Sequence, residues 1–175
     1  MMQKIKELFE LPDSEDQDVV SPAPPTAYSI NPLTEDDTLE LMRVSLRCFR
    51  GSESYNVETF NYLLREPHIL GYKAVTSMHA IAGFLFIIAN KGMIAHITTI
   101  AVAPEHRKRS IAQKLLAHAE KALIAKGLES IVLEVRVSNY AAQNLYSNLD
   151  YVIIQKLSAY YNDDEDAFLM SKSLV

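Results

Sequence analysis

One segment constrains this chain more than any other: a strand pattern passes through a basic turn directly into a helix pattern. Residues 94–102 are rich in β-branched side chains, which favours a strand. From residue 111 apolar side chains recur at helical spacing, and Gly127 suits the position just past a helix end. Residues 107–109, Arg-Lys-Arg, lie between the two. Because the first N–H groups of a helix lack partners and its dipole is positive there, this unit predicts a pyrophosphate site.

Three adjacent basic residues are by themselves more typical of a solvated turn or of a nuclear-localisation-type cluster. Their surroundings favour the phosphate site: a strand comes before them, the small residues Ser110 and Ala112 follow, and an apolar helix comes after. On these residues alone both interpretations stay open.

The hydrophobic pattern of the remaining chain predicts a mixed sheet with helices on its faces, which is the α/β class in its α+β form. Further strands are expected at residues 28–31, 70–76, 81–89, 131–137, 151–157 and 168–170. Further helices are expected at residues 35–50, 57–65 and 140–149. The order is then β, α, α, three strands joined by hairpins, and α, β, α, β, β.

Size and composition suit one compact domain and exclude several classes of protein. The chain has 175 residues, and its 22 acidic and 17 basic residues give a net charge of −5, which argues against a globally basic nucleic-acid binder. The single cysteine, Cys48, rules out an intramolecular disulfide and a cysteine-based metal site, so a reducing compartment is expected. No apolar run reaches the ~18 residues of a membrane span. We expect a soluble cytoplasmic protein with no membrane or nucleic-acid partner.

The N-terminal residues differ from the rest of the chain. Residues 1–11 allow a short amphipathic helix, and after an acidic stretch the chain reads Ser21-Pro-Ala-Pro-Pro25. Three prolines in four residues cannot continue a helix or join a central strand, so this stretch is interpreted as a linker. A flexible tail and a docking helix both remain open. The expected division is an extension over residues 1–26 and a folded domain over residues 27–175.

Two parts of the sequence resemble known acetyltransferases. Residues 107–112, Arg-Lys-Arg-Ser-Ile-Ala, resemble the acyl-CoA-binding motif Arg/Gln-x-x-Gly-x-Gly/Ala of the GNAT superfamily of N-acetyltransferases. One residue departs from that motif, since Ser110 stands where the family usually has glycine. Residues 133–140, Leu145-Tyr146 and residues 160–170 are similar to the protein N-terminal acetyltransferases of the archaeal RimI/Ard1 type.

The resemblance extends over residues 28–175 and implies the GNAT fold, a mixed, mostly antiparallel central sheet with one splayed parallel strand pair and helices on both faces. It implies direct transfer of an acetyl group from acetyl-CoA to the α-amino group of protein N-termini in a ternary complex, without a metal. Two alternatives remain: acetylation of lysine side chains or of a small amine, and a non-catalytic acyl-CoA-binding protein. Ser110 and the N-terminal extension motivate the last one. Whether an auxiliary subunit exists stays open.

The same resemblance assigns the acetyl-CoA contacts. Peptide groups of Ile100, Ala101 and Val102, on the splayed strand, would bind the pantetheine arm. The pyrophosphate would be held by Arg107, Lys108, Arg109, Ser110, Ile111 and Ala112. Asn139 would contact the cofactor, and Tyr146 would lie close to its sulfur.

Attack on a thioester needs a neutral amine, and an α-amino pKa near ~7.7–8.0 makes a weak base sufficient. His96 and Glu134 fall on the two strands expected to flank the cofactor, where they could relay a proton directly or through water. Both match residues that serve as bases in archaeal relatives. The alternatives are a packed strand histidine and, for Glu134, a structural partner of Arg136 or of a backbone amide. Tyr146 is the candidate acid for the departing thiolate, with a core tyrosine as the alternative.

The peptide-binding residues implied by the resemblance are Phe49, Glu53, Tyr55, Tyr160 and Tyr161. Tyr160 and Tyr161 fall in the hairpin loop that lies over the peptide N-terminus in these relatives, unless they form an exposed aromatic pair. Residues 49–55 would shape the pocket for the first side chain from the opposite wall. Glu53 is also a candidate base there, and Glu58 competes with it.

Overall fold

The computed structural model describes residues 20–49, 54–89 and 92–175, and these contain seven strands and four α-helices. The strands are β1 (Tyr28–Pro32), β2 (Ile69–Thr76), β3 (Ile81–Ile88), β4 (Ile94–Val102), β5 (Ser130–Arg136), β6 (Val152–Leu157) and β7 (Ala167–Ser173). The helices are α1 (Thr38–Cys48), α2 (Val57–Arg65), α3 (Ile111–Ala125) and α4 (Tyr140–Ser147). Each strand and helix expected between residues 28 and 175 is confirmed, with ends that differ by a few residues. The helix expected over residues 1–11 lies outside the described residues.

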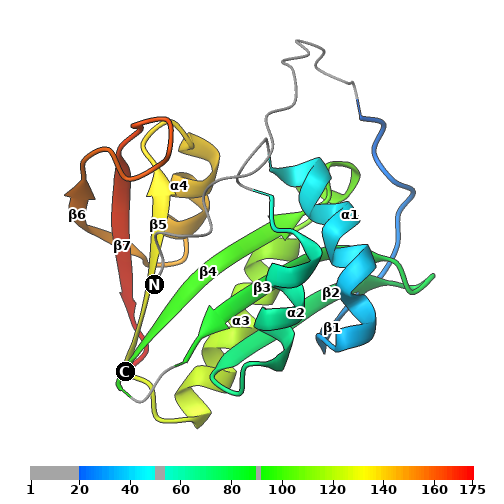
Figure 1. Cartoon of the computed structure of the whole chain (residues 1–175), viewed down its shortest axis with the longest axis horizontal. Helices are drawn as coiled ribbons and strands as arrows, with labels where there is room; N and C mark the ends of the chain where they lie inside the picture. The colour runs from blue at the N-terminus through cyan, green and yellow to red at the C-terminus, as the bar shows by residue number, and fades with distance from the viewer. Residues whose placement is uncertain (1–19, 50–53, 90–91) are drawn as a thin grey trace.

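The strands form one mixed sheet in the order β1-β2-β3-β4-β5-β7-β6 (Figure 1). All neighbouring strands are antiparallel except β4 and β5, which are parallel. That parallel pairing covers only the three positions from Ile94↔Ser130 to His96↔Val132. Beyond it β4 continues to Val102 and β5 to Arg136, and Figure 1 shows the two strands diverging. The expected splayed parallel pair is thereby confirmed.

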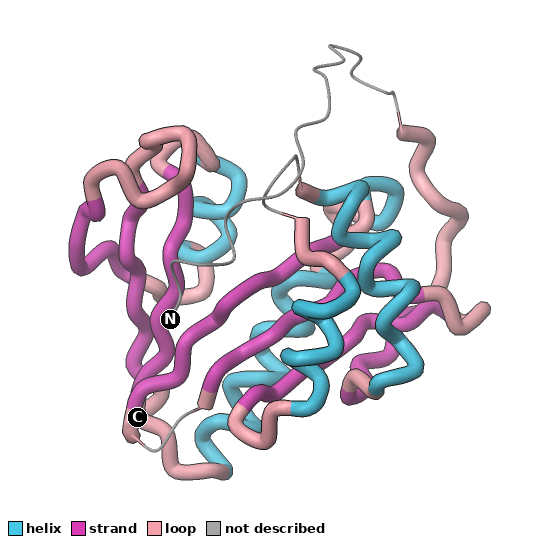
Figure 2. Tube along the Cα trace, in the orientation of Figure 1, coloured by secondary structure: helices cyan, strands magenta, loops and turns pink. Residues whose placement is uncertain are grey.

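Helices cover both faces of the sheet, as Figure 2 shows. On one face α1 and α2 enclose an aromatic core around Leu41, Phe60, Phe84 and Phe86. On the other face α3 and α4 pack over a larger aliphatic core, and the buried side chains of α3 that enter it are Ile111, Leu115, Leu116, Ala119 and Leu123. Because this side of α3 is so fully buried, the helix start is held in a fixed position against the end of β4.

A β-bulge interrupts the pairing of β3 with β4. Phe86 pairs with Thr99 but the next residue, Ile87, pairs with Ile97, so Thr98 is an extra residue in β4. The Thr98 hydroxyl donates to the Phe86 carbonyl at 3.2 Å. Bulges redirect the side chains on either side of them and are frequent next to active sites. Here the bulge separates the paired start of β4 from its splayed end.

The Pro-rich segment before β1 lies against the domain. Residues 20–26 form no helix or strand, and the Ala23 N–H donates to the carbonyl of Glu105, which follows β4. The Thr26 hydroxyl lies 2.9 Å from that of Ser77 in the β2–β3 turn. In Figure 1 this is the dark-blue segment that leads to β1. Among the described residues, no helix has the length and apolarity that crossing a membrane requires.

Candidate active site

The turn between β4 and α3, residues 107–110, exposes unpaired backbone donors. The N–H groups of residues 110–113 find no acceptor within the described residues, whereas the Lys114 N–H already donates to the Ser110 carbonyl at 3.0 Å. Lys108 and Ser110 have φ of 59° and 57°, the left-handed region that favours glycine. This conformation gives a physical reason for a glycine at the Ser110 position in the motif. The Ser110 hydroxyl makes no capping bond to the helix.

The three basic side chains of this turn point to different partners. Arg107 donates from Nε to the Val102 carbonyl at 3.2 Å, and Lys108 is exposed without a partner in the described part of the chain. The Arg109 guanidinium donates to the Pro24 carbonyl at 3.0 Å, to the Tyr28 hydroxyl at 2.9 Å and also to the Ala23 carbonyl. Arg109 is therefore engaged with the Pro-rich segment.

Two peptide groups of the splayed part of β4 face away from β3. The Ala103 N–H donates to the Ala82 carbonyl at 2.9 Å, which fixes the alternation along this antiparallel pair. By that alternation Ala101 directs its peptide groups to β3, whereas Ile100 and Val102 direct theirs to the side where β5 has diverged. The Val102 carbonyl also accepts from Cys48 Sγ at 3.3 Å. Its N–H group remains as a donor on the open side.

The candidate base and its partner meet where β4 and β5 separate. His96 Nε2 lies 2.6 Å from Glu134 Oε2, and the two side chains are 28% and 18% exposed. His96 pairs with Val132, and because side chains alternate along a strand, Glu134 lies on the same face one step further on. Arg136, the alternative partner considered for Glu134, makes ion pairs with Asp163 and Glu165 of the β6–β7 loop.

Two tyrosines lie beside this pair. Burial raises the pKa of Tyr160, and the nearby Glu134 carboxylate and Tyr55 raise it further. The Tyr55 hydroxyl lies 3.5 Å from the carbonyl oxygen of Thr98, the bulge residue, and burial raises the Tyr55 pKa as well. The structure thus brings together residues from four separate segments: His96, Glu134, Tyr55 and Tyr160.

Helix α4 holds the two remaining cofactor candidates. Asn139 caps this helix: its Oδ1 accepts from the Ala142 N–H at 3.1 Å, and its amide NH₂ has no partner among the described residues. Tyr146 is buried, and its ring centroid lies 5.6 Å from that of Tyr151. Burial raises the pKa of Tyr146 far above the usual value for a phenol.

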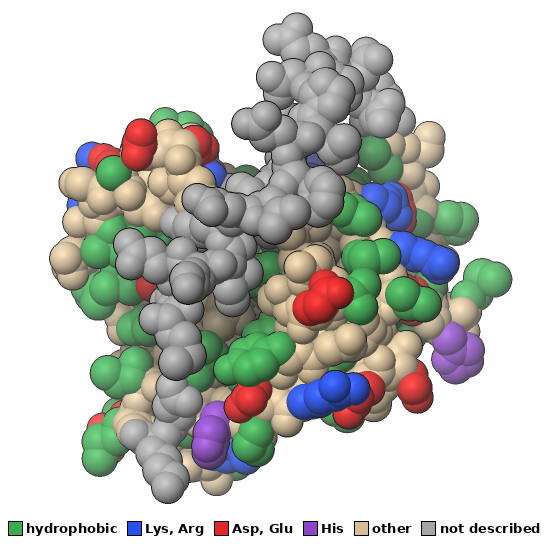
Figure 3. All heavy atoms as spheres, in the orientation of Figure 1, with side chains coloured by type: hydrophobic (Ala, Val, Ile, Leu, Met, Phe, Trp, Pro, Cys, Tyr) green, Lys and Arg blue, Asp and Glu red, His purple; other side chains and the backbone are tan. Residues whose placement is uncertain are grey.

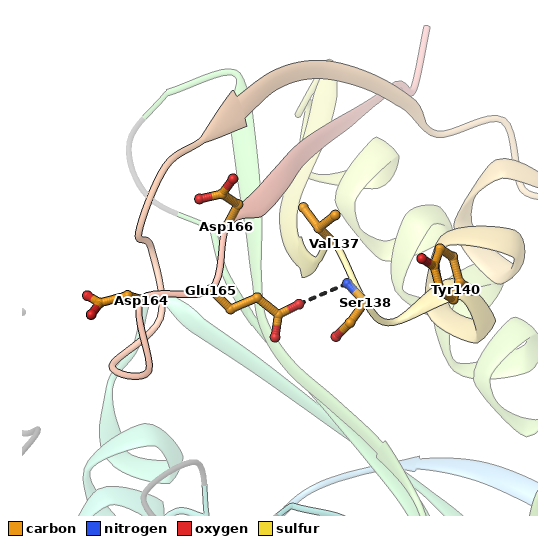
Figure 4. A pocket seen from close by; sticks show the side chains of 6 residues that line it. All are labelled: Val137, Ser138, Tyr140, Asp164, Glu165 and Asp166. Carbon is orange, nitrogen blue, oxygen red and sulfur yellow. Dashed lines mark hydrogen bonds between the residues drawn. The ribbon is translucent and has the colours of Figure 1, made fainter.

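An ion-pair cluster holds the loop between β6 and β7. Arg136 lies 2.6 Å from Glu165 and 3.0 Å from Asp163, and its guanidinium carbon lies 3.8 Å from the centre of the Tyr161 ring. Glu165 also accepts the N–H of Ser138 at 2.8 Å, the dashed line in Figure 4. Figure 3 shows acidic side chains gathered over this loop.

Sequence reasoning assigned no role in this loop to Arg136 or Glu165. The signal that could have found them is the alternation Val132-x-Glu134-x-Arg136, which places a cation on the face of the candidate base. The shallow pocket in Figure 4 is lined by residues 137, 138, 140 and 164–166 and contains none of the expected site residues.

The opposite wall is only partly described. Phe49 ends α1, where its N–H donates to the Ser45 carbonyl, and its side chain packs on the core beneath α1 and α2. Glu58 is exposed in the first turn of α2, the end at which a carboxylate complements the helix dipole. Glu53 lies outside the described residues, so its expected role is a prediction only.

Comparison with known proteins identifies the family. Residues 35–151 match the model described as "Acetyltransferase (GNAT) family". A curated N-alpha-acetyltransferase of Saccharolobus solfataricus is 44% identical over 80 residues, which span 45% of this chain and about half (48%) of that protein. The N-terminal acetyltransferase A complex catalytic subunit NAA10 of Arabidopsis thaliana is 35% identical over 147 residues, 81% of this chain and 75% of that one.

Solved structures agree on the fold. The ribosomal-protein-S18-alanine N-acetyltransferase from Escherichia coli superposes with a TM-score of 0.76 at 25% identity, covering 85% of this chain and 94% of that one. Ard1 from Thermoplasma volcanium also superposes with a TM-score of 0.76, at 23% identity, covering 85% and 99%. The seven-stranded sheet with one splayed parallel pair is therefore the shared architecture.

Proposed function

Because the chain belongs to the GNAT acetyltransferase family and is similar over most of its length to an N-alpha-acetyltransferase, we propose that it acetylates the α-amino groups of protein N-termini with acetyl-CoA. The single observation that carries the mechanism is the 2.6 Å contact between His96 and Glu134 at the point where β4 and β5 separate. His96 acts as the base, and Glu134 orients it.

The contact supports one assignment of the basic ring nitrogen. With the proton on Nε2, His96 donates to the Glu134 carboxylate and keeps a lone pair on Nδ1. Nδ1 takes the proton from the attacking amine, directly or through a water. The Glu134 carboxylate then stabilises the imidazolium that forms. An α-amino group with a pKa near ~7.7–8.0 is partly neutral at pH 7, so this modest base is enough.

The residues around the splay fit acetyl-CoA, which supplies the thioester whose acetyl group is transferred. The unpaired N–H groups of residues 110–113 and the positive end of α3 suit a pyrophosphate. Arg107 and Lys108 add positive charge to the same turn. The peptide groups of Ile100 and Val102 that face the open side are suited to an amide-bearing arm, and the Asn139 NH₂ is a further donor toward it.

Tyr146 donates a hydrogen bond to the leaving sulfur. A thiol has an ordinary pKa near ~8.5, whereas burial holds the pKa of Tyr146 well above that of a free phenol. Complete proton transfer from Tyr146 to the thiolate is therefore uphill. A hydrogen bond that stabilises the developing charge while the phenol keeps its proton fits these values better than an acid that gives the proton up.

The peptide side is formed by the loop and the tyrosines. Tyr160 and Tyr161 hold the first residues of the substrate from the β6–β7 loop, and Tyr55 lies opposite them near Thr98. Phe49 and Glu53 belong to this second wall. The carboxylate of Glu134 and the phenol groups around it suit a cationic amine entering the site.

The test is a peptide panel with labelled acetyl-CoA. Three substrates are compared: a peptide with a free α-amino group and no lysine, its N-terminally blocked counterpart carrying one internal lysine, and spermidine. We expect label only on the first, with His96→Ala lowering its transfer. Preferential labelling of the blocked lysine peptide or of spermidine would contradict the proposal, and so would a chain that binds CoA and transfers nothing.

A further inference from the structure

We propose that the Pro-rich segment, residues 20–26 (the strap), holds the pyrophosphate turn, residues 107–110, in its binding shape, and that Arg109 is the positioning residue that joins them. The inference rests on the proposed role of this turn in acetyl-CoA binding. It gives the linker a function and changes the role that the motif alone suggests for Arg109, from phosphate ligand to anchor.

The strap contacts the turn through Arg109 and the segment just before the turn through Glu105. Arg109 donates to the carbonyls of Ala23 and Pro24, while the Ala23 N–H donates back to the Glu105 carbonyl at 3.0 Å. Glu105 is itself held by Arg47 of α1, with Arg47 Nη1 2.9 Å from Glu105 Oε1. The strap therefore contacts Arg109 within the turn and Glu105 in the short 3-10 segment just before it.

The first strand adds a further anchor. The Tyr28 hydroxyl accepts from Arg109 at 2.9 Å and lies 2.9 Å from Nδ1 of the buried His106. These two contacts hold the Tyr28 hydroxyl between Arg109 and His106. Arg109 is thus fixed by three acceptors from one continuous segment, residues 23–28.

Prolines suit this strap for a physical reason. Each proline fixes φ near −65°, so Pro22, Pro24 and Pro25 keep the segment extended and reduce the entropy lost when it docks. An extended proline-rich backbone makes no internal hydrogen bonds, so its carbonyls are free to accept from another group. The guanidinium of Arg109, with its donors in a fixed planar fork, matches two successive carbonyls.

The turn needs such support because its backbone is strained. Lys108 and Ser110 both have positive φ although each carries a Cβ, and Arg109 is the residue between them. With glycine the left-handed conformation at position 110 would need no support. In this chain the strap stabilises the left-handed backbone at Ser110, which a glycine at that position of the motif would adopt without support.

The strap leaves the donors of the turn uncovered. It reaches the turn together with β1, which is at one end of the strand order, whereas β5 lies on the other side of β4. The N–H groups of residues 110–113 remain without an acceptor in the described part of the chain even though the strap is docked. The strap therefore supports the site and does not occupy it.

The experiment is a calorimetric titration of CoA into full-length variants: Arg109→Gln, Ser110→Gly, the double variant, and Ala23→Pro. Ala23→Pro keeps the strap extended but removes the N–H that donates to Glu105. Lys121→Gln on the exposed side of α3 is the control for loss of one positive charge. Circular dichroism shows that each variant is folded.

We expect Arg109→Gln to weaken CoA binding about tenfold, Ala23→Pro to weaken it severalfold, and Lys121→Gln to leave it unchanged. In the Ser110→Gly background the Arg109→Gln effect should fall below about threefold, because glycine no longer needs the support. Equal loss in both backgrounds, with Ala23→Pro silent, would show that Arg109 is a phosphate ligand and overturn the inference. A wild-type chain that bound no CoA would instead overturn the proposed function.

Discussion

Glu134 contacts His96 through a single ring nitrogen. On that basis the proposed mechanism makes His96 the base and Glu134 the residue that orients it. A carboxylate at 2.6 Å fixes both the tautomer and the plane of the imidazole. In the proposed mechanism the opposite nitrogen, Nδ1, accepts the proton of the attacking amine. Two groups so closely joined act as one unit, so removing one impairs the other.

Substitution of the pair should therefore be non-additive. We expect His96→Ala to lower kcat for a peptide about 10²-fold, as is typical of a lost general base, and Glu134→Gln to lower it less. The double variant should be within about threefold of His96→Ala, because Glu134 acts through His96. Steady-state kinetics at saturating acetyl-CoA measure this. If the kcat reductions of the two single variants multiplied in the double variant, His96 and Glu134 would act by independent proton routes.

Tyr146→Phe tests the hydrogen bond to the leaving sulfur. We expect kcat to fall roughly tenfold, the value of one hydrogen bond to a charged acceptor, while CoA affinity stays within about twofold. Since burial raises the Tyr146 pKa above its ordinary value of 10, the wild-type rate should show no loss from Tyr146 ionisation up to pH 9.5. A decline between pH 8 and 9.5 that Tyr146→Phe abolished would contradict this.

At the scale of elements, the β6–β7 loop gains its shape from charges rather than from an apolar core. Hydrogen bonds from Ser138 and Arg136 lower the pKa of Glu165, and the hydrogen bond from Arg136 lowers that of Asp163. Arg136 lies on β5 two residues beyond Glu134, so a single strand positions both the proposed proton relay and the proposed substrate loop. The position of the loop is thereby tied, through β5, to the position of Glu134.

Arg136→Gln should loosen that loop. We expect KM for peptide to rise about five- to tenfold, kcat to change less than twofold, and CoA affinity to be unchanged, as for lost substrate positioning. Tyr160→Ala with Tyr161→Ala should raise KM in the same way. The matched control is Lys156→Gln, which removes a mostly exposed ion pair with Asp166 and should have little effect. A loss of CoA binding in Arg136→Gln would place the loop elsewhere.

The elements themselves could be predicted from the sequence, because each has a clear period of hydrophobic residues. The approach of His96 to Glu134 was also predictable, since both lie on strands expected to flank one cofactor. The Thr98 bulge was not, because a β-branched run continues through it without a turn residue. The contacts of Arg136 with Asp163 and Glu165 were not predicted, because alternation shows which face a residue shares but not which charge across the loop it meets.

At the scale of the whole molecule, the docked strap contacts a turn that is distant from it in the sequence. No local sequence pattern predicts this contact. Arg109 and Pro24 are 85 residues apart in the sequence. Prolines predict only that the backbone is extended, and a run of three basic residues predicts only positive charge. Which arginine turns toward which carbonyl depends on the packing of α3 against β1, and that requires the assembled domain.

The contacts near the strap should make the fold sensitive to acid. Burial lowers the pKa of His106, and although burial alone would raise the pKa of Glu105, the hydrogen bond from Arg47 holds it below its usual value. Both groups have a lower pKa when folded, so both stabilise the fold above their ordinary pKa values of 6.5 and 4.5. That stability is lost as the pH falls through the folded values.

Urea unfolding at pH 7.5, 5.5 and 4 measures this dependence. We expect the free energy of unfolding to decrease at each step, with Glu105→Gln flattening the step below pH 5.5 and His106→Gln flattening the step above it. Constant stability from pH 7.5 to 4 in the wild-type chain would contradict the assignment.

Between the two halves of the sheet, β1 to β4 and β5 to β7, strand pairing is limited to three residue pairs of β4 and β5. Acetyl-CoA bound between the diverging strands would link the two halves, because it would contact α3 and β4 on one side and α4 on the other. A ligand that binds only the folded state adds about 2.7 kcal/mol to the free energy of unfolding at a hundred times its Kd. The stability of the protein would then rise and fall with the concentration of acetyl-CoA around it.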